Sequence, residues 1–215
     1  MHTLLVEINV MIYEHEHGNT EYYLDTEDFH GDYKILADNI LDLAALGMKD
    51  QLTGIPNRRS FDNRLNLEWG RAMREKKPLS ILMLDVDKFK NYNDAYGHQQ
   101  GDVALQTVAK SLKRSIKRSV DFAARWGGEE FIALLPITSS AGAVSVAEKV
   151  RKNIENAIIP SVDEGSSKLT VSIGVSSKIP SPENSIGVFI SAADAALYKA
   201  KSAGRNRVVL GENDG

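Results

Sequence analysis

The stretch Arg125-Trp126-Gly127-Gly128-Glu129-Glu130-Phe131 predicts a β-hairpin with two carboxylates at its tip. Gly127 and Gly128 can adopt positive φ, which a two-residue hairpin turn requires, and they leave room for a bulky ligand against the backbone. Side chains alternate along a strand, which places Phe131, Ala133 and Leu135 on one face and Ile132 and Leu134 on the other. Two acids beside so apolar a hairpin are costly unless they bind a cation. Carboxylates placed in this way serve hard cations in phosphate chemistry.

Length and composition indicate an ordinary globular protein with one main domain and a smaller appendage, because 42% of its 215 residues are hydrophobic and 26% are charged. Cysteine is absent, which excludes disulfides and thiolate metal sites. A net charge of −3 gives no reason to expect nucleic-acid binding. The apolar stretch of residues 4–12 is interrupted by Glu7 and Asn9, is too short to span a bilayer and lacks a basic region before it. We therefore expect a cytoplasmic chain with no membrane segment.

The charge is distributed unevenly along the chain. Residues 1–49 contain ten acids against two bases, a balance of −8, whereas the remainder contains 19 acids against 24 bases, a balance of +5. This shift predicts an acidic N-terminal segment, residues 1–49, joined to a main domain, residues 50–211. His15-Glu16-His17 in the first segment is either a metal cluster or, as we favour, a solvated polar turn.

A helix is predicted between Tyr33 and Met48, leading into the main domain. Leu36, Ile40 and Leu43 recur there at i, i+4 and i+7, which is helical spacing. This helix either packs on its own domain or forms a short dimerising coil, and the pattern contains too few heptads to decide between them.

The main domain alternates helical and strand patterns. We expect helices over residues 60–76, 102–118, 143–158 and 190–202, with Ser60 capping the first and Pro78 following its end. We expect strands over residues 79–86, 169–176 and 207–210 besides the hairpin of residues 122–136. The near-continuous apolar run of residues 79–86 is typical of a central strand buried on both faces. This order predicts an α+β fold with a mixed sheet and helices on one side, of the ferredoxin-like or nucleotidyl-transferase palm kind.

In such a sheet the strand of residues 79–86 ends beside the hairpin tip. Asp85 is therefore expected to meet Glu129 and Glu130. Carboxylates that converge from separate strands form a usual Mg²⁺ site for phosphoryl and nucleotidyl transfer. The alternative is that all three are merely exposed acids at strand ends.

Further blocks of sequence accompany the hairpin. They are Asp50-Gln51-Leu52-Thr53-Gly54-Ile55-Pro56-Asn57-Arg58-Arg59, Asp85-Val86-Asp87-Lys88-Phe89-Lys90, Asn93-Asp94-Ala95-Tyr96-Gly97-His98 with Gly101-Asp102, Ser172-Ile173-Gly174-Val175, Ala193-Asp194 with Ala196-Leu197-Tyr198, and Lys201-Ser202-Ala203-Gly204-Arg205-Asn206-Arg207. In order and spacing, over roughly residues 50–210, the chain resembles the GGDEF family of diguanylate cyclases in its Gly-Gly-Glu-Glu-Phe variant.

The resemblance implies an α+β nucleotidyl-cyclase palm with a mixed central sheet, surrounding helices and an N-terminal helical lead-in. It implies that two GTP are condensed into cyclic di-GMP and two pyrophosphates. Each domain then holds one GTP in a half-site, and two half-sites must face each other in a homodimer. Residues 1–49 are expected to set or sense that geometry. They resemble no sensor domain that we can name, and they could be the remnant of a longer receptor with a membrane segment upstream.

Roles for the acids and cations follow from the same resemblance. Asp85, the carbonyl of Val86 and Glu129 resemble the ligands of Mg²⁺ or Mn²⁺, and Glu130 resembles either a ligand of a second ion or the base for the attacking 3′-hydroxyl. Gly127 and Gly128 would let the backbone lie against the phosphates. The cations that resemble those neutralising the triphosphate are Lys90, Lys201 and Arg205.

Lys201 and Arg205 stand at i, i+4 near a helix end, so we expect them to project the same way. A solvated basic face is the alternative interpretation of this pair.

Asn93 and Asp102 resemble the residues that recognise guanine. A carboxylate can accept hydrogen bonds from N1–H and the exocyclic amine of guanine, which adenine cannot supply, so Asp102 favours GTP over ATP. Asp102 could also be a helix N-cap.

A second site is indicated by Arg118-Ser119-Val120-Asp121, which stands five residues before Gly127. It resembles the RxxD site through which the product inhibits the family, although a surface ion pair would explain the same residues. Where the family often has a further arginine, this chain has Lys149. Lysine cannot make a bidentate fork, so we expect weaker inhibition by cyclic di-GMP.

Two other classes of function remain open. One is a catalytically silent GGDEF domain that binds GTP or cyclic di-GMP as a regulator, and the other is a purely structural dimerisation module. The presence of Asp85, Glu129, Glu130, Asn93 and Asp102 favours the enzyme over both.

Overall fold

The computed structural model describes residues 10–14, 20–24, 47–160 and 166–211. The chain divides into two compact units, Met1–Lys49 and Asp50–Gly215. In the first unit, β1 (Val10–Glu14) and β2 (Thr20–Leu24) pair as an antiparallel hairpin. The His15-Glu16-His17 cluster and nearly all of the helix predicted over residues 33–48 lie outside the described residues.

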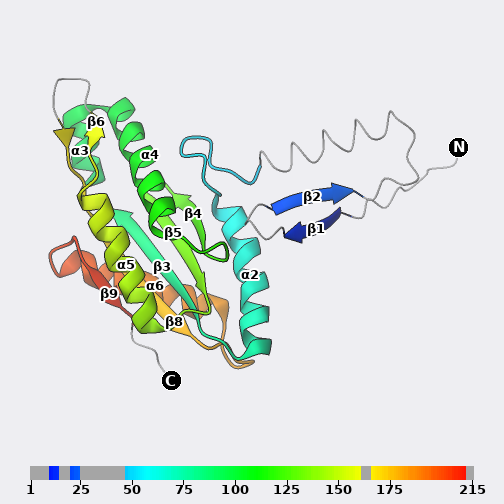
Figure 1. Cartoon of the computed structure of the whole chain (residues 1–215). Coiled ribbons are helices and arrows are strands. Elements are labelled where there is room, and N and C mark those ends of the chain that lie inside the picture. Colours follow the sequence, from blue (N-terminus) through cyan, green and yellow to red (C-terminus); the bar gives the residue numbers. More distant parts are fainter. Residues whose placement is uncertain (1–9, 15–19, 25–46, 161–165, 212–215) are drawn as a thin grey trace, which may run out of the picture. The chain divides into compact units, whose positions relative to one another are not determined.

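The second unit is built on a mixed five-stranded sheet in the order β4-β5-β3-β8-β9 (Figure 1). Its strands are β3 (Leu79–Val86), β4 (Phe122–Gly127), β5 (Glu130–Pro136), β8 (Val171–Lys178) and β9 (Val208–Leu210). Only the β8–β9 pair is parallel. All eight residues of β3 are buried, which confirms the predicted central strand. Beside the sheet, β6 (Ile159–Pro160) and β7 (Ser166–Ser167) form a small ladder.

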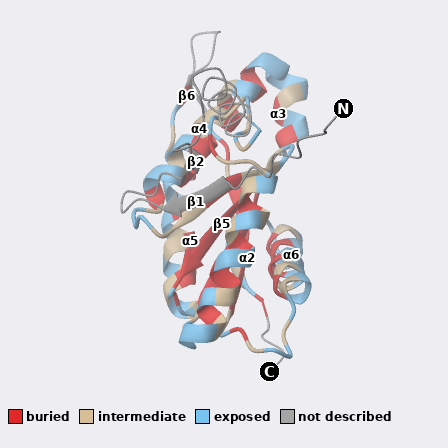
Figure 2. Ribbon diagram, turned by 90° about the vertical axis from the view of Figure 1, so that its right-hand side faces the viewer, coloured by how far each residue is buried: buried red, intermediate tan, exposed pale blue. Residues whose placement is uncertain are grey.

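Helices cover both faces of the sheet. They are α2 (Arg58–Glu75), α3 (Phe89–Tyr96), α4 (His98–Ser115), α5 (Ser140–Glu155) and α6 (Ile186–Ser202). Phe131, Ala133 and Leu135 share a core with α4 and α5, whereas Ile132 and Leu134 share a second core with α2 and α6. Figure 2 shows α5 to the left of β5 and α6 to the right, with α2 in front.

The alternation predicted for β5 is thus confirmed, and so is the α+β fold with surrounding helices. The prediction of helices on one side is wrong. The sheet has two apolar faces, and each of them needs a covering layer to remove it from water.

Two helix starts differ from the predictions. Asn57, and not Ser60, caps α2, because its side chain accepts a hydrogen bond from the backbone N–H of Ser60 at 3.1 Å. The helix predicted from Asp102 begins earlier, at His98, and a separate helix α3 precedes it across Gly97, whose φ is 81°. Asp102 therefore lies inside α4 and is not its N-cap.

The hairpin tip also differs by one residue from the prediction. Gly127 belongs to β4 and pairs with Glu130, so the two turn residues are Gly128 and Glu129. The register shifts between Arg125 and Gly127, which places an irregularity at Trp126. Positive φ is needed only at Gly128, where it is 51°.

Gly174 allows α6 to lie directly on β8. A Cβ at this position would stand 2.0 Å from the carbonyl oxygen of Ala193 and 2.3 Å from the backbone N of Leu197. Both atoms belong to the backbone of α6 and cannot rotate away. Glycine at 174 therefore sets how closely α6, and every side chain on it, approaches the sheet.

We predict that Gly174→Ala lowers the free energy of unfolding by about 1–3 kcal/mol, because α6 must move outward to accommodate the methyl group. Urea denaturation measures the effect. Gly187→Ala is the matched control, since only Ser185 Oγ lies within reach of its Cβ, at 3.9 Å. That control should be neutral or slightly stabilising, and an equal loss in both variants would contradict the packing argument.

Candidate active site

Asp85 lies next to last on the central strand and meets the hairpin at its tip. Its register partners are Glu130 on β5 and Ser172 on β8. The backbone N–H of Val86 donates to the carbonyl oxygen of Glu129 at 3.3 Å. The predicted meeting of the strand end with the two glutamates is confirmed, although the strands pair residue by residue rather than only converging at their ends.

Lys201 forms an ion pair with Asp85. Its Nζ lies 2.7 Å from Oδ2 of Asp85, and the two side chains are 33% and 10% exposed. Lys201 belongs to the last turn of α6, the helix that packs on Gly174. The sheet therefore supplies the carboxyl groups of this site, and a helix packed on the sheet supplies the positively charged lysine.

The three carboxyl groups share an environment that disfavours their charge. Burial raises the pKa of Asp85, and repulsion from Asp87 acts in the same direction, while Lys201 and Arg205 oppose them. Burial first, and then the charge of Asp85, raise the pKa of Glu129 and Glu130. One lysine in contact does not balance three acids, so an excess of negative charge remains at the site.

Arg205 does not extend the helix that carries Lys201. The helix α6 ends at Ser202, and Arg205 has a left-handed backbone with a φ of 65°. The helical i, i+4 relation expected for this pair is wrong, because α6 ends before Arg205 and the backbone continues with positive φ at Gly204 and Arg205. The charge of Arg205 nevertheless lowers the pKa of Asp85, so both cations act on the same carboxylate.

Asn93 and Asp102 come from two successive helices, α3 and α4. The Oδ1 atom of Asn93 is buried and has no hydrogen-bond partner within the part of the chain that the structure describes. It lies against Gly101, where a Cβ would stand 1.9 Å away from it. Asp102 is exposed on the following position of α4, and Lys90 is exposed on α3. A buried acceptor without a partner is costly, and it is explained where a ligand supplies the donor.

Arg118 and Asp121 form a bidentate ion pair. The Nε atom of Arg118 donates to both carboxylate oxygens, at 3.0 and 3.1 Å. The same guanidinium donates to the carbonyl oxygen of Pro136 and to Oγ1 of Thr138. Lys149 donates instead to the carbonyl of Ser115 at the end of α4. The ion pair foreseen as an alternative is present, while the Arg118 side chain stays 46% exposed and accessible to a ligand.

Arg125 connects the domain entrance to the hairpin turn, a role that the sequence did not reveal. Its Nη1 lies 3.0 and 3.1 Å from the carboxylate oxygens of Asp50, and its Nε and Nη2 donate to the carbonyl oxygen of Gly128. Asp50 also accepts from the backbone and hydroxyl of Thr53. No local pattern could indicate a pair so distant in sequence.

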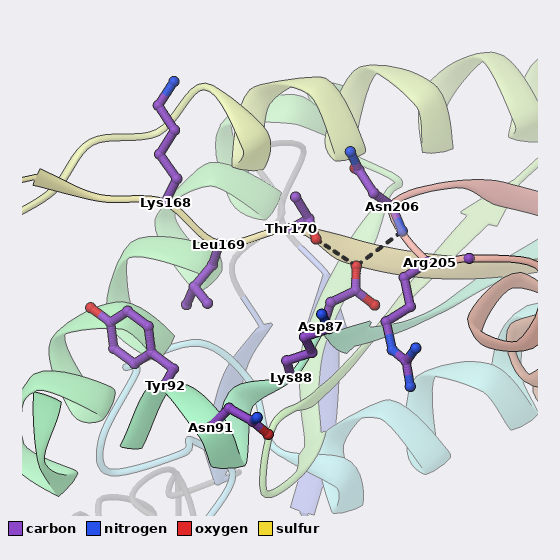
Figure 3. A pocket seen from close by; sticks show the side chains of 10 residues that line it. Asp87, Lys88, Asn91, Tyr92, Lys168, Leu169, Thr170, Arg205 and Asn206 are labelled. Carbon is purple, nitrogen blue, oxygen red and sulfur yellow. Dashed lines mark hydrogen bonds between the residues drawn. The ribbon is translucent and has the colours of Figure 1, made fainter. Parts of the chain in front are cut away.

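A cavity of about 460 Å³ opens behind the strand end (Figure 3). Among the residues that line it are Asp87, Lys88, Tyr92, Lys168, Arg205 and Asn206. Asp87, the second acid of Asp85-Val86-Asp87, is buried. Its carboxylate accepts from Thr170, Ser172 and the backbone of Asn206 at 2.7–3.0 Å. Asp85 and Asp87 therefore face different surroundings although they are two residues apart.

The family described as "Diguanylate cyclase, GGDEF domain" matches residues 48–207, which contain all of these features. The chain belongs to the GGDEF family. Diguanylate cyclase A of Treponema denticola is 49% identical over 140 residues, which are 65% of this chain and 37% of that protein. The chain thus spans little more than a third of the length of this relative.

Solved structures resemble the GGDEF domain over most of the chain. The coiled coil and GGDEF domain of DgcB from Caulobacter crescentus, in complex with c-di-GMP, has a TM-score of 0.77 at 29% identity, over 83% of this chain and 93% of that one. The active GGEEF domain of a diguanylate cyclase from Vibrio cholerae has a TM-score of 0.67 at 34% identity, over 74% of this chain and 98% of that one. Within the described residues of our chain, no helix is both long and apolar enough to cross a membrane.

We predict that Asp50→Ala lowers the free energy of unfolding of the GGDEF domain by about 1–3 kcal/mol, because it leaves the guanidinium of Arg125 largely buried without its acid. The two side chains are 14% and 21% exposed. Glu75→Ala breaks the exposed pair with Arg71 on α2 and should cost less than about 0.5 kcal/mol. Chemical denaturation compares the two variants, and equal costs would show that the pair does not stabilise the entrance.

Proposed function

We propose that this chain is a diguanylate cyclase, which condenses two GTP into cyclic di-GMP and releases two pyrophosphates. The observation that carries the proposal is the alignment of Asp85 with Glu130 across the central strands, with Lys201 paired to Asp85, in a chain of the GGDEF family. Such a site suits nucleotidyl transfer, in which catalysis is mainly positioning and neutralisation of charge.

The residues of this site fit a divalent cation. Mg²⁺ takes oxygen ligands, and the carboxylates of Asp85, Glu129 and Glu130, whose pKa values are all raised by burial, would supply some of them together with the carbonyl of Val86. Within the described residues no three acidic or histidine side chains are grouped closely enough to hold an ion by themselves, and an ion at Asp85 would compete with Lys201. A bound Mg²⁺ or Mn²⁺ would polarise the phosphates of GTP. Asp85, Val86 and Glu129 would hold it, with Glu130 as a further ligand or as the base for the 3′-hydroxyl.

Guanine recognition is assigned to Asn93 and Asp102. The unpartnered Oδ1 of Asn93 offers an acceptor for the exocyclic amine of guanine, and the carboxylate of Asp102 can accept from the N1–H edge. Adenine would leave these acceptors without donors, so the pair favours GTP over ATP.

The triphosphate is assigned to the cations around Asp85. Lys201 and Arg205 both act on that carboxylate, and Lys90 projects from α3. Gly127 and Gly128 have open space around their Cα atoms, so the backbone of the turn can approach the phosphates without a steric clash.

One such domain holds only one GTP, so the reaction requires a homodimer in which two sites face each other. Each 3′-hydroxyl then attacks the α-phosphate of the opposite nucleotide, forming one ester bond and releasing one pyrophosphate. Residues 1–49 precede the ion pair that fixes the domain entrance, and we assign them to setting the geometry of the dimer.

We predict that the purified chain with GTP and Mg²⁺ forms cyclic di-GMP and pyrophosphate in a ratio of one to two, at a rate per chain that rises with protein concentration. Asp85→Asn should reduce this rate roughly 100-fold or more, because it removes the charge at the centre of the site. Asp62→Asn on α2 is the control and should retain activity. Chromatography of the products measures both. Binding of GTP without any product would instead support a silent, nucleotide-binding GGDEF domain.

Product inhibition is assigned to the RxxD residues Arg118 and Asp121. Arg118 is held in a defined direction by Asp121 and Thr138 and remains partly exposed, which suits stacking on a guanine base and pairing with a phosphate. Lys149 is engaged with a helix-end carbonyl and offers a single point charge, so inhibition should be weaker than with a second arginine.

Arg118→Ala should weaken the binding of cyclic di-GMP roughly tenfold or more, since it removes charge-assisted hydrogen bonds. Calorimetric titration of the chain with cyclic di-GMP measures the dissociation constant. Arg71→Ala removes a similarly exposed, acid-paired arginine from α2 and should leave the affinity unchanged. Unchanged affinity in Arg118→Ala would eliminate this site.

A further inference from the structure

The turn after α6 holds two consecutive non-glycine residues in the left-handed conformation. The φ angle is 65° at Arg205 and 46° at Asn206. This conformation is unfavourable for residues with a Cβ, and asparagine tolerates it better than arginine does. Such backbone persists only where the surroundings fix it, and it is concentrated at functional sites.

Asn206 is fixed by three partners from two parts of the fold, the turn after β3 and the helix α5. Its backbone N–H donates to Oδ2 of Asp87 at 3.0 Å. Its side-chain amide donates to Oε1 of Glu155 at 2.7 Å and accepts from Nη1 of Arg151 at 2.8 Å. The backbone donor and both ends of the side-chain amide are therefore in use, which restrains the position of this residue from two directions.

The partners on α5 are themselves held in place. Arg151 pairs with Glu155 at 3.0 Å and with Glu148 at 3.0 Å along the same helix. The hydrogen bond from Asn206 is the main reason that the pKa of Glu155 is lowered. The side-chain amide of Asn206 thus bonds to Arg151 and Glu155, which already hold each other in place through their ion pair.

Asp87 anchors the other side of the turn. Its carboxylate accepts hydrogen bonds from the hydroxyls of Thr170 and Ser172, both at 2.7 Å, besides the N–H of Asn206. Since its oxygens are occupied within the protein, this acid serves the turn and leaves the cation site to Asp85.

Arg205 itself points the other way. In Figure 3 the side chains of Arg205 and Asn206 leave the turn in opposite directions. The structure gives the guanidinium of Arg205 no hydrogen bond or ion pair within the described residues. A strained backbone held on one side thus presents an unengaged cation on the other, where Arg205 lines the cavity next to the end of β3.

We propose that Asn206 is a positioning residue: held by Asp87, Glu155 and Arg151, it fixes the backbone of Arg205 so that the guanidinium faces the phosphates of GTP. This inference rests on the proposed function in naming GTP as the ligand. The polar groups of Asn206 are engaged with the protein, so we assign it a role that acts through Arg205. If the contacts merely tied the end of α6 to α5, their loss would affect stability and leave the phosphate contact intact.

The test is a binding measurement with 3′-deoxy-GTP and Mg²⁺, since this nucleotide lacks the attacking hydroxyl and is not turned over. Asn206→Gly removes the amide and keeps access to the left-handed region, so the fold should be retained. Glu155→Ala removes one partner without changing the turn sequence. We expect both variants to bind 3′-deoxy-GTP more weakly, Asn206→Gly by roughly tenfold. Glu75→Ala, which breaks an exposed ion pair on α2, should bind as the unmodified chain does.

A double-mutant cycle with Arg205→Ala separates positioning from stability. If Asn206 acts through Arg205, the double variant binds as Arg205→Ala alone does, whereas independent effects would multiply. Multiplied effects, or normal binding by Asn206→Gly, overturn the inference and leave the proposed function standing. Failure of the unmodified chain to bind the nucleotide overturns both.

Discussion

The antiparallel pairing of β3 with β5 and β8 is the constraint on which the rest of the structure depends. Because β3 is buried on both faces, a slip of its register by one residue would exchange the side chains that it gives to the two cores and disrupt the packing of both. That register sets Asp85 opposite Glu130. The apolar strand thus places the acids, and the hydrophobic energy of the core maintains a cluster of charges that would otherwise separate.

The electrostatics of the site follow from that placement. Strand pairing brings Asp85 near both glutamates, and burial denies them the solvation that would relieve their repulsion. Lys201 supplies one compensating charge in contact, and Arg205 contributes from beyond the helix end. The remaining imbalance leaves the three carboxyl groups with an excess of negative charge.

The spacing of apolar residues along the sequence correctly predicted the strands whose burial depends only on whether one or both faces of the strand are covered. The apolar run of β3 and the two-residue alternation of β5 were both confirmed, since each depends only on which faces are covered. The acids at the tip followed from the same pattern. What the sequence concealed depends on single backbone geometries and on distant pairs. The break at Gly97, the irregularity at Trp126 and the bond between Asp50 and Arg125 leave no local periodic signal.

The dependence of Lys201 on α6 has a consequence for biogenesis. The site consists of contacts between parts that are distant in sequence. β3 pairs with β5 and β8, and Asp85 is neutralised only when Lys201 on α6 reaches it. Contacts of this kind form late in folding, because the conformational entropy lost in closing the long loops must be overcome before the contacts can stabilise the fold. A chain emerging from the ribosome therefore cannot form the ion pair between Lys201 and Asp85 until α6 has docked on the sheet. The order of elements along the chain therefore delays neutralisation of Asp85 until the C-terminal part of the domain is in place.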